Sequence, residues 1–363
     1  MRSINILIKT TNQCNMRCKY CFHEKYGYSD SYLDLNVFEK TINMLASDYD
    51  HINIIWHGGE PLLSSLEFFE NAYSICNANQ GSFSFSIQTN ATLLEEKSIL
   101  FFKNNNTKIG ISFDGLCNEN TRGNTELILN NISLLKKFDC NVGAILVATQ
   151  RNVNNLIQEY EYFKKLEIGL KINPLFSDGA AIQEKDLFLN VDDYINQIIL
   201  LYKYWVKDTD CRINVSNFKI LTNLIVKNRS NICTFNSCLG KWLCLDVDGS
   251  VYPCDRLCTS DFLLGNINNI SNTVELFDNE NFKNLIKKSI IRRNACIDNC
   301  EYYKMCYGGC NANALLYGDL TNVTNSNFCK IQKGLIKGIK QELLDVNTNT
   351  DKTKYNPYFL NLL

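Results

Sequence analysis

The stretch that decides the fold is Cys14-Asn15-Met16-Arg17-Cys18-Lys19-Tyr20-Cys21, in which three cysteines follow the spacing CxxxCxxC. It comes soon after an apolar run, residues 4–9, whose pattern is typical of a β-strand. Structural zinc sites use four closed ligands, whereas three local cysteines suit a four-iron cluster with one iron left open. We therefore predict such a cluster in the loop after the first strand. A zinc site with a distant fourth ligand is the alternative.

Strand-like and helix-like segments alternate up to about residue 210. Apolar runs typical of strands cover residues 4–9, 52–56, 83–88, 108–113, 142–148 and 170–175. Segments with helical apolar spacing follow, for example at residues 66–78, 93–103, 126–137 and 156–166. Strands that alternate with helices at this spacing indicate βα units around a parallel sheet. Six units predict an α/β fold with a partial (βα)6 TIM-like barrel, whose site lies at the C-terminal ends of its strands.

The composition indicates a folded protein of a reducing compartment. The chain has 363 residues, of which 45% are hydrophobic and 21% charged, and its formal net charge is -1. These values exclude a disordered chain and a protein whose nucleic-acid affinity depends on neutralising phosphates. No apolar run is long enough to span a membrane, and the first residues lack a signal-peptide pattern. The 17 cysteines therefore indicate metal binding or redox chemistry in the cytoplasm.

Short polar motifs follow the next three predicted strands. They are His57-Gly58-Gly59-Glu60-Pro61, Gln88-Thr89-Asn90 and Ser112-Phe113-Asp114-Gly115, and Arg122 follows a few residues later. Together with the cysteine triplet and Tyr20, these motifs resemble the signature of the radical S-adenosylmethionine (SAM) superfamily. The family's second motif reads QTNG, whereas this chain has Ala91 in place of the glycine. Its usual HDxxR segment is incomplete here, because only Arg122 matches it.

The resemblance implies how SAM is bound. An open iron of the cluster held by Cys14, Cys18 and Cys21 takes the amino and carboxylate groups of SAM. The GGEP element pairs with the amino group, because glycines let backbone carbonyls approach the ligand and Glu60 offers an acceptor. Arg122 is the candidate partner of the carboxylate. The implied SAM-binding residues are Tyr20, Gly58, Gly59, Glu60, Pro61, Gln88, Thr89, Asn90, Ser112, Asp114 and Arg122.

A second group of cysteines lies in the last third of the chain, where short strands and turns replace the βα pattern. Its members are Cys238, Cys244, Cys254, Cys296, Cys300, Cys306, Cys310 and Cys329. Asp248-Gly249, flanked by strand-forming residues, predicts a two-residue hairpin turn. This turn pairs Cys244 with Pro253 and brings Cys254 to the open end of the hairpin, so that two thiols reach one place.

The layout of these eight cysteines resembles the SPASM domain, although CxxxC stands at Cys296 and Cys300 where the family has CxxC. The resemblance implies two fully ligated auxiliary clusters, and hence three 4Fe–4S clusters in all. Cys238, Cys244, Cys254 and Cys310 hold the first auxiliary cluster, and Cys296, Cys300, Cys306 and Cys329 hold the second. Full ligation leaves no free iron and so favours electron transfer. Two structural zinc ions are the alternative.

The predicted organisation has three parts. A radical SAM partial barrel covers residues 1–215, a small Cys-rich α+β SPASM domain covers residues 233–335, and a helix with a polar tail covers residues 336–363. We place the domain boundary between about residues 210 and 232. Among the cysteines outside the motifs, Cys76 and Cys140 fit small buried residues. Cys117 and Cys258 lie beside motifs, which makes them candidates for contact with substrate.

The resemblance implies a radical SAM oxidoreductase that acts on a peptide. We favour a peptide maturase that installs a thioether or carbon–carbon cross-link, because residues 56–63 look more like that group. The alternative is an anaerobic sulfatase-maturating enzyme, which oxidises Cys or Ser to formylglycine. That type resembles Tyr252-Pro253-Cys254-Asp255, but it usually carries CxYCFY and QGGEP where this chain has His23 and His57. A non-catalytic iron–sulfur electron carrier is the alternative of another class.

Asp255 is the candidate catalytic base, because it directly follows Cys254 and the reaction must release a proton. A cap of the turn that leaves the hairpin is its alternative role. The expected partners are a precursor peptide or protein and a reducing partner such as flavodoxin or ferredoxin. Because the first motif begins at Cys14, we expect either a separate leader-binding protein or direct grip of the precursor. We expect no nucleic-acid partner and no membrane association.

Overall fold

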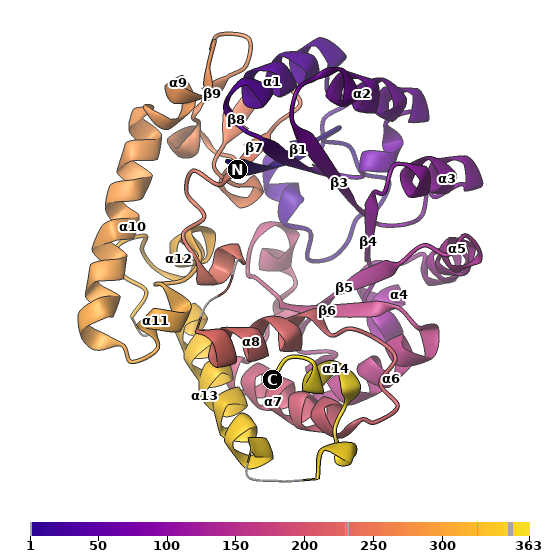
Figure 1. Ribbon diagram of the computed structural model, residues 1–363, viewed down its shortest axis with the longest axis vertical. Coiled ribbons are helices and arrows are strands. Elements are labelled where there is room, and N and C mark those ends of the chain that lie inside the picture. Colours follow the sequence, from indigo (N-terminus) through magenta and orange to yellow (C-terminus); the bar gives the residue numbers. More distant parts are fainter. Residues whose placement is uncertain (1, 229, 231, 325, 348–350) are drawn as a thin grey trace. The chain divides into compact units, whose positions relative to one another are not determined.

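The computed structural model describes residues 2–228, 230, 232–324, 326–347 and 351–363 (Figure 1). The chain forms two compact units that interleave along the sequence. The first unit contains residues 1–112, 122–142 and 238–287, and the second contains residues 113–121, 143–237 and 288–363. The domain boundaries expected from the sequence remain a prediction. In the part of the chain that is described, no helix is long and apolar enough to cross a membrane.

The first unit is built on parallel strands in the order β4-β3-β2-β1. The strands are β1 (Ser3–Lys9), β2 (His51–His57), β3 (Ser82–Thr89) and β4 (Lys108–Ser112). The helices between and after them are α1 (Leu35–Asp48), α2 (Leu66–Ala78), α3 (Glu96–Asn104) and α5 (Thr125–Lys137). The predicted alternation of strands with helices is therefore confirmed in this unit.

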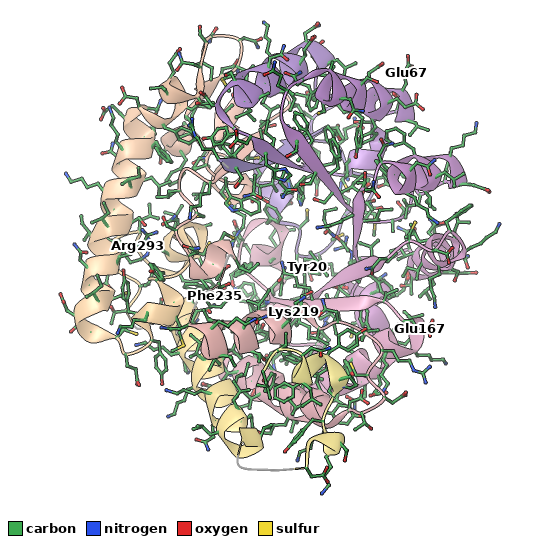
Figure 2. The ribbon with its side chains drawn as sticks, in the orientation of Figure 1. Tyr20, Glu67, Glu167, Lys219, Phe235 and Arg293 are labelled. Atoms are coloured by element: carbon green, nitrogen blue, oxygen red, sulfur yellow. The ribbon has the colours of Figure 1, made fainter. Side chains whose placement is uncertain are left out.

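Alternating side chains give the strands of this sheet two different faces. In β2 every second residue is buried, ending with Trp56, which is fully buried. The Trp56 ring packs edge-on against Phe69 of α2, and its Nε1–H donates to the Tyr73 hydroxyl at 3.2 Å. Figure 1 shows α1 and α2 beside these strands, and Figure 2 shows Glu67 on the outer surface of α2. The other face, which includes His57, is left for the site.

A segment far along the chain extends the same sheet. β7 (Trp242–Leu245) pairs in parallel with β1, with Leu7 opposite Cys244. β8 (Ser250–Tyr252) and β9 (Gly265–Asn266) follow as antiparallel strands, and α9 (Thr273–Phe277) comes next. The cysteine-rich segment therefore begins as an extension of the N-terminal sheet, a pairing that the sequence did not predict.

The second unit packs helices around the parallel pair β5 (Val142–Ala148) and β6 (Gly169–Pro174). Its helices are α4 (Asn118–Thr121), α6 (Leu156–Leu166), α7 (Val191–Lys207), α8 (Ser216–Lys227), most of α10 (Glu280–Asn299), α11 (Tyr303–Cys306), α12 (Asn311–Tyr317), α13 (Asn327–Asn347) and α14 (Pro357–Leu360). The Asn217 side chain of α8 bonds both the N–H and the C=O of Ile172 on β6, each at 2.7 Å. Helical packing on β6 thus continues past residue 210, where we had expected the pattern to end.

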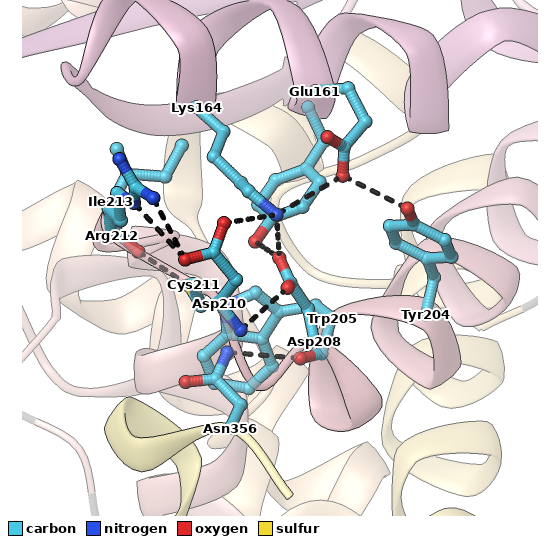
Figure 3. A network of polar contacts seen from close by, with 11 residues as sticks. Glu161, Lys164, Tyr204, Trp205, Asp208, Asp210, Cys211, Arg212, Ile213 and Asn356 are labelled. Carbon is cyan, nitrogen blue, oxygen red and sulfur yellow. Dashed lines mark hydrogen bonds and ion pairs between the residues drawn. The ribbon is translucent and has the colours of Figure 1, made fainter.

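The C-terminal segment packs on α7 where the sequence suggested a polar tail. Figure 3 shows Asn356 donating to the backbone carbonyl of Trp205, at 3.0 Å. Beside it, Lys164 of α6 forms an ion pair of 2.8 Å with Asp208, just past the end of α7. Asn356 is fully buried, so its amide replaces water as the partner of the helix end. Residues 348–350 of the predicted tail lie outside the described residues.

Candidate functional site

The cysteine loop, residues 10–21, follows β1 in the first unit. Its cysteines Cys14, Cys18 and Cys21 are all partly exposed. The backbone folds back within the triplet, because the N–H of Cys21 donates to the carbonyl of Cys18 at 3.1 Å. Burial raises the pKa of the Cys14 thiol, and the charges of Glu60 and Cys21 raise it further. The loop thus gathers thiols at the carboxyl end of β1, as the predicted open-iron cluster requires.

The segment directly after β2, residues 58–60, holds the cysteine loop in place. The N–H of Gly59 donates to the carbonyl of Thr11 at 3.0 Å, and the N–H of Glu60 donates to that of Gln13 at 2.8 Å. A Cβ atom at Gly59 would lie 2.0 Å from the Gln13 oxygen, and one at Gly58 would lie 2.3 Å from the Thr11 oxygen. Gly58 also has a φ of 126°. In the structure the missing Cβ atoms leave room for the cysteine loop. The expected approach of these glycines to SAM remains a prediction.

Glu60 joins the ends of β2 and β3. Its carboxylate accepts from the Thr89 hydroxyl at 2.6 Å, the Asn90 N–H at 2.7 Å and the Leu62 N–H at 3.1 Å. Burial raises the pKa of Glu60, and these three donors oppose the rise. Pro61 begins a short 3-10 turn directly after it. Both carboxylate oxygens therefore have partners within the protein, and the predicted role of Glu60 toward SAM remains a prediction.

The Gln88-Thr89-Asn90 motif lies next to the cysteine loop. The Asn90 side-chain amide donates to the side chain of Asn15 at 2.8 Å and lies 3.9 Å from the Cys14 sulfur. Ala91, where the family has glycine, has a φ of 63°, a left-handed conformation that strains a residue with a Cβ. Gln88 donates to the Ser112 hydroxyl at 2.9 Å, which links the ends of β3 and β4.

Arg122 and Tyr20 meet at the same loop. The Arg122 guanidinium donates to the Tyr20 hydroxyl at 3.0 Å, and its carbon lies 5.9 Å from the centre of the Tyr20 ring. Its positive charge lowers the pKa of both Cys14 and Glu60, which places the guanidinium near both groups. The structure thus brings Arg122 and Tyr20 together, and the role of Arg122 toward the SAM carboxylate remains a prediction.

Asp114 belongs to the second unit, where its carboxylate accepts hydrogen bonds from nearby residues. Its carboxylate accepts from the Thr121 hydroxyl at 2.6 Å and from the Val147 N–H at 2.9 Å. The adjacent turn is held by Glu159 of α6, which accepts from the Leu116 N–H at 2.9 Å. Glu159 is fully buried, and burial raises its pKa to about 7. Sequence analysis missed Glu159, because a glutamate in an amphipathic helix gives no signal of burial.

The hairpin of the cysteine-rich segment forms in a different register from the predicted one. Cys244 lies opposite Tyr252 and not Pro253, and the turn spans three residues between Asp246 and Ser250. The N–H of Asp246 donates to the Ser250 carbonyl at 2.8 Å, which fixes this longer turn. Since alternate residues of a strand share a face, the shift of one residue brings Cys254 to the same side as Cys244. The prediction of a shared location holds, but the two-residue turn was wrong.

Three thiols gather at this hairpin, and we call Cys244, Cys254 and Cys258 the first thiol group. The sulfur of Cys258 lies 3.9 Å from that of Cys244, and both residues are buried. Beside them the fully buried Lys9 ammonium forms an ion pair of 2.5 Å with Asp246. Negative charge at Cys244, Cys258 and Asp246 raises the pKa of Lys9 despite its burial. Of the other two predicted ligands, Cys238 belongs to this unit and Cys310 to the second.

Two histidines and Asp255 lie near the first thiol group. The rings of His23 and His57 stack with centres 5.4 Å apart. Burial lowers the pKa of both imidazoles, and the charge of Asp255 opposes this effect at His57. His23 Nε2 and His57 Nδ1 are buried and have no hydrogen-bond partner among the described residues. Asp255 itself lies with Oδ1 3.2 Å from the Cys254 sulfur.

The second thiol group consists of Cys296, Cys300, Cys306 and Cys329, all in the second unit. These cysteines line one cavity with about 360 Å³ of empty space. Cys296 lies on α10 and Cys300 follows its last residue, so the CxxxC spacing separates them by one helical turn. Burial raises the pKa of the Cys306 thiol to about 12, and the charges of Cys329 and Cys296 add to this. The structure thus brings together all four predicted ligands.

The arrangement of the second thiol group is compatible with a four-iron cluster. No three His, Cys, Asp or Glu side chains of the described residues converge on one metal position. A four-iron cluster needs thiolates spread around a cavity, one for each iron, and four cysteines around one cavity provide that arrangement. Structural zinc, the predicted alternative, also needs four thiolates, and the choice between the two remains a prediction.

A further cavity of the second unit has about 790 Å³ of empty space. Its lining is mostly apolar, with Lys171 and Gln332 among the polar members. Burial lowers the pKa of the Lys171 ammonium, and the charge of Cys233 opposes this. A cavity of this composition can accept an apolar side chain and a nearby negative group.

Comparison with known proteins agrees with this geometry. Residues 8–161 match the model of the radical SAM superfamily. Over 360 residues the chain is 28% identical to a cysteine-type anaerobic sulfatase-maturating enzyme of Clostridium novyi, covering 93% of this chain and 95% of that protein. It is 27% identical over 365 residues to the radical SAM cyclopropyl synthase TigE of Paramaledivibacter caminithermalis, covering 92% of this chain and 73% of that protein.

A solved structure, native anSMEcpe with bound AdoMet and Cp18Cys peptide, has a similar fold. Its TM-score is 0.80 at 25% identity, covering 94% of this chain and 98% of that chain. The α/β fold class predicted from the strand and helix pattern is therefore confirmed.

Proposed function

We propose that this chain, which is a radical SAM enzyme, oxidatively modifies a residue within a ribosomally made peptide or protein. The observation that carries the proposal is the combination of three cysteine sites in one chain. A three-cysteine loop lies at the carboxyl end of β1, and two further thiol groups lie elsewhere in the fold. A non-catalytic electron carrier needs no motif that surrounds an open iron, so enzyme function accounts for more of the site.

The chemistry that the open-iron cluster supplies when bound is one-electron cleavage of SAM to methionine and a 5′-deoxyadenosyl radical, which removes a hydrogen atom from the substrate. In this proposal Cys14, Cys18 and Cys21 hold the cluster, and Arg122 beside Tyr20 holds the SAM carboxylate. The bonds from Gly59 and Glu60 to the cysteine loop fix its position at the strand ends. The residues that hold the cluster and SAM must keep fixed positions, because a misplaced radical reacts with the wrong atom.

Formation of a stable product removes one more electron and one proton from the substrate radical. We assign the electron to the two auxiliary clusters that the resemblance implies. Cys238, Cys244, Cys254 and Cys310 hold one of them, and the second thiol group holds the other. We assign the proton to Asp255, whose carboxylate lies beside Cys254. The closeness of Asp255 to Cys254 supports a shared location for loss of the proton and of the electron.

Two products compete within this class. A thioether or carbon–carbon cross-link is favoured by His23 and His57, which replace residues usual in the sulfatase-maturating type and stack on each other near Asp255. The similarity to the cyclopropyl synthase also supports bond formation. Formylglycine formation is favoured by the similarity to the C. novyi enzyme along 93% of the chain. Both routes begin with the same loss of a hydrogen atom, an electron and a proton.

The proposed partners follow from this chemistry. A precursor peptide or a protein segment is the substrate, and a flavodoxin or ferredoxin supplies electrons. A leader-binding protein presents the precursor unless the chain grips it directly. The cytoplasm is the proposed compartment, because iron–sulfur clusters and 17 cysteines are compatible with its reducing conditions.

The test uses anaerobically reconstituted enzyme with SAM, dithionite and two kinds of probe. One probe is the Cp18Cys peptide, and the others are short Cys- or aromatic-rich peptides encoded beside the chain. We expect 5′-deoxyadenosine, and deuterium in it when the modified peptide position is labelled. Mass spectrometry separates a cross-link, which loses two hydrogens, from formylglycine made from Cys, which loses two hydrogens and also exchanges sulfur for oxygen. Absence of SAM cleavage by iron-loaded protein would contradict the enzyme proposal, and cleavage without change in any peptide would contradict the substrate class.

A further inference from the structure

We infer that the large cavity of the second unit is a subsite for the substrate peptide and takes an aromatic side chain next to an aspartate or glutamate. The inference rests on the peptide substrate proposed above and names the residues that the chain selects in it. The cavity has about 790 Å³ of empty space, within the range of about 300–1,000 Å³ for ligand pockets. We call it the β6 cavity, because residues 171–174 of β6 line it.

The carboxyl half of β6 forms one wall of this cavity. In parallel barrels that end of a strand carries the residues that meet the substrate. Leu170 and Ile172 are buried and Lys171 between them is exposed, because successive side chains of a strand point to opposite faces. The Asn217 side chain bonds both backbone groups of Ile172 at 2.7 Å, which fixes the strand. Lys171 is therefore presented to the cavity from a rigid element.

The charge of Lys171 is the first argument for an acidic ligand. The side chain reaches open space, while the protein around it lowers the pKa of its ammonium. Of the neighbouring groups in the described part of the chain, Cys233 opposes this effect and no carboxylate does. None of the described residues that line the β6 cavity is Asp or Glu. A carboxylate of the ligand can therefore form a charge-assisted hydrogen bond with Lys171 without displacing another one.

Two further polar side chains of the lining have unused hydrogen-bonding capacity. Tyr194 of α7 is 2% exposed, and burial raises the pKa of its phenol without a contribution from any hydrogen bond among the described residues. Gln332 of α13 is 9% exposed, and its Oε1 is buried and has no partner in the described part of the chain. Buried polar groups normally have partners. A peptide backbone, which offers both N–H and C=O groups, can supply them.

The rest of the lining is mostly apolar. It includes the rings of Phe235, which Figure 2 labels, and Phe328, and both residues are buried. Aromatic rings favour edge-on or offset contact with another ring. A small anion would use Lys171 and leave these walls without a partner, whereas an apolar ligand would leave Lys171 without one. An aromatic residue beside an acidic residue uses both.

The position of the β6 cavity favours the substrate over an unrelated small molecule. Phe328 and Gln332 line both this cavity and the cavity of the second thiol group, and all of these residues belong to the second unit. A peptide in the β6 cavity therefore lies next to the cysteines to which we assign electron transfer.

Lys219 provides a matched control for the test. It is an exposed lysine of α8, the helix that also contributes Asn217, and it lies outside the lining of the β6 cavity (Figure 2). Glutamate at either position changes the net charge of the second unit by the same amount. The change at Lys171 alone reverses the charge that faces the cavity.

The experiment measures peptide binding to reconstituted full-length protein by isothermal titration calorimetry. The probes are short peptides of Gly and Ser with blocked ends that contain Phe-Glu, Phe-Gln, Phe-Lys or Ala-Glu. We expect wild type to bind Phe-Glu about tenfold or more tightly than Phe-Lys, Lys171→Glu to reverse this order, and Lys219→Glu to keep it, because like charges repel at close range. Ala-Glu should also bind about tenfold more weakly than Phe-Glu, because it leaves the apolar walls uncovered.

A second measurement locates the bound peptide. Benzoylphenylalanine in place of Phe should, after irradiation, attach to lining residues of α8 or α13, which mass spectrometry of the digested protein identifies. Attachment elsewhere would overturn the inference. So would failure of wild type to bind Phe-Glu, equal binding of Phe-Glu and Phe-Lys, or an unchanged preference in Lys171→Glu.

Two controls keep the outcomes separate. Lys171→Met, which keeps the stem and removes the charge, should lose the preference for Glu over Lys, and it decides the question if circular dichroism shows that Lys171→Glu does not fold. Binding is measured without SAM cleavage. Protein that binds Phe-Glu as expected but modifies no peptide would contradict the proposed function and leave the peptide site in place.

Discussion

The two thiol groups are built on different kinds of backbone. The first is carried by strands and a tight turn, with Cys244 on β7 next to β1 and fully buried. The second is carried by helices, and its four cysteines are all partly exposed around a cavity. Strand register therefore decides the first group, whereas one-turn spacing along α10 decides the position of Cys296 and Cys300 in the second.

This difference has a consequence for stability. Cys244 and Cys258 are buried beside Lys9 in the core of the first unit, so they contribute to the fold as well as to any cluster there. Partly exposed thiols around a cavity contribute chiefly to a cluster. Variants can separate these roles, and they can also separate both auxiliary groups from the cysteine loop.

The largest effect is expected at the cysteine loop, which is the reference for the comparison. Replacing Cys14, Cys18 and Cys21 together with Ala should abolish SAM cleavage, because no other group holds the open iron. Folding should largely survive, since these residues are only partly buried. The measurement is 5′-deoxyadenosine release by chromatography, with circular dichroism as the fold control. Release at the wild-type rate would remove the loop from the mechanism.

Variants of the two thiol groups should have different effects from variants of the cysteine loop, and different effects from each other. Cys244→Ala with Cys300→Ala should keep SAM cleavage and lose the finished peptide product, because the second electron has no outlet. As single variants, Cys244→Ala should lower the free energy of unfolding by about 1–2 kcal/mol and Cys300→Ala by about 0.5 kcal/mol or less, given their different burial. Urea unfolding of the cluster-free variants measures this, because cluster binding itself stabilises the fold. A folded double variant with full product formation would refute the electron-outlet role.

Asp255 tests whether the first thiol group is also the place of proton loss. Asp255→Asn keeps the shape and removes the basicity, so product formation should fall by about 100-fold or more. SAM cleavage and deuterium transfer from labelled peptide to 5′-deoxyadenosine should continue. If the variant makes product at the normal rate, Asp255 only caps the turn and the base is another group.

The smallest effect is expected at Glu159, which belongs to neither thiol group. Burial raises its pKa to about 7 from 4.5, so protonation favours the folded state. This contribution is complete below about pH 4.5 and is lost as the pH rises through about 7. Between pH 5 and a pH above 7, the free energy of unfolding of wild type should fall by up to about 3 kcal/mol more than that of Glu159→Gln. The reason is that the glutamine stays uncharged over this range.

The matched control is Glu167→Gln, which changes an exposed carboxylate just past the end of the same helix (Figure 2). Unfolding in urea at several pH values measures the difference. Parallel pH profiles for wild type and Glu159→Gln would show that Glu159 does not titrate between its two states.

Sequence patterns predicted elements better than they predicted pairing. The bounds of α2 and α6 matched the apolar spacing, because one face of each helix is buried. The pairing of β7 with β1 was missed, since the residues that pair are about 240 positions apart and no local pattern records it. The hairpin register was wrong by one residue, because Asp248-Gly249 also fits a three-residue turn.

At the site, the structure shows contacts among the predicted residues that the sequence did not predict. The sequence placed Glu60 and the two glycines against SAM, whereas their described contacts hold the cysteine loop and the end of β3. The stacking of His23 on His57 and the burial of Glu159 gave no signal, because both depend on contacts between distant segments. The SAM contacts and the cluster ligands remain predictions that loaded protein must test.

The most direct test of the central claim is the metal content of anaerobically reconstituted wild-type protein, measured with its Mössbauer spectrum. The account predicts about twelve irons per chain, all in four-iron clusters, one of which changes its spectrum when SAM binds. About four irons with two zinc ions per chain would contradict it, because the two thiol groups would then be structural metal sites and the substrate radical would have no electron outlet.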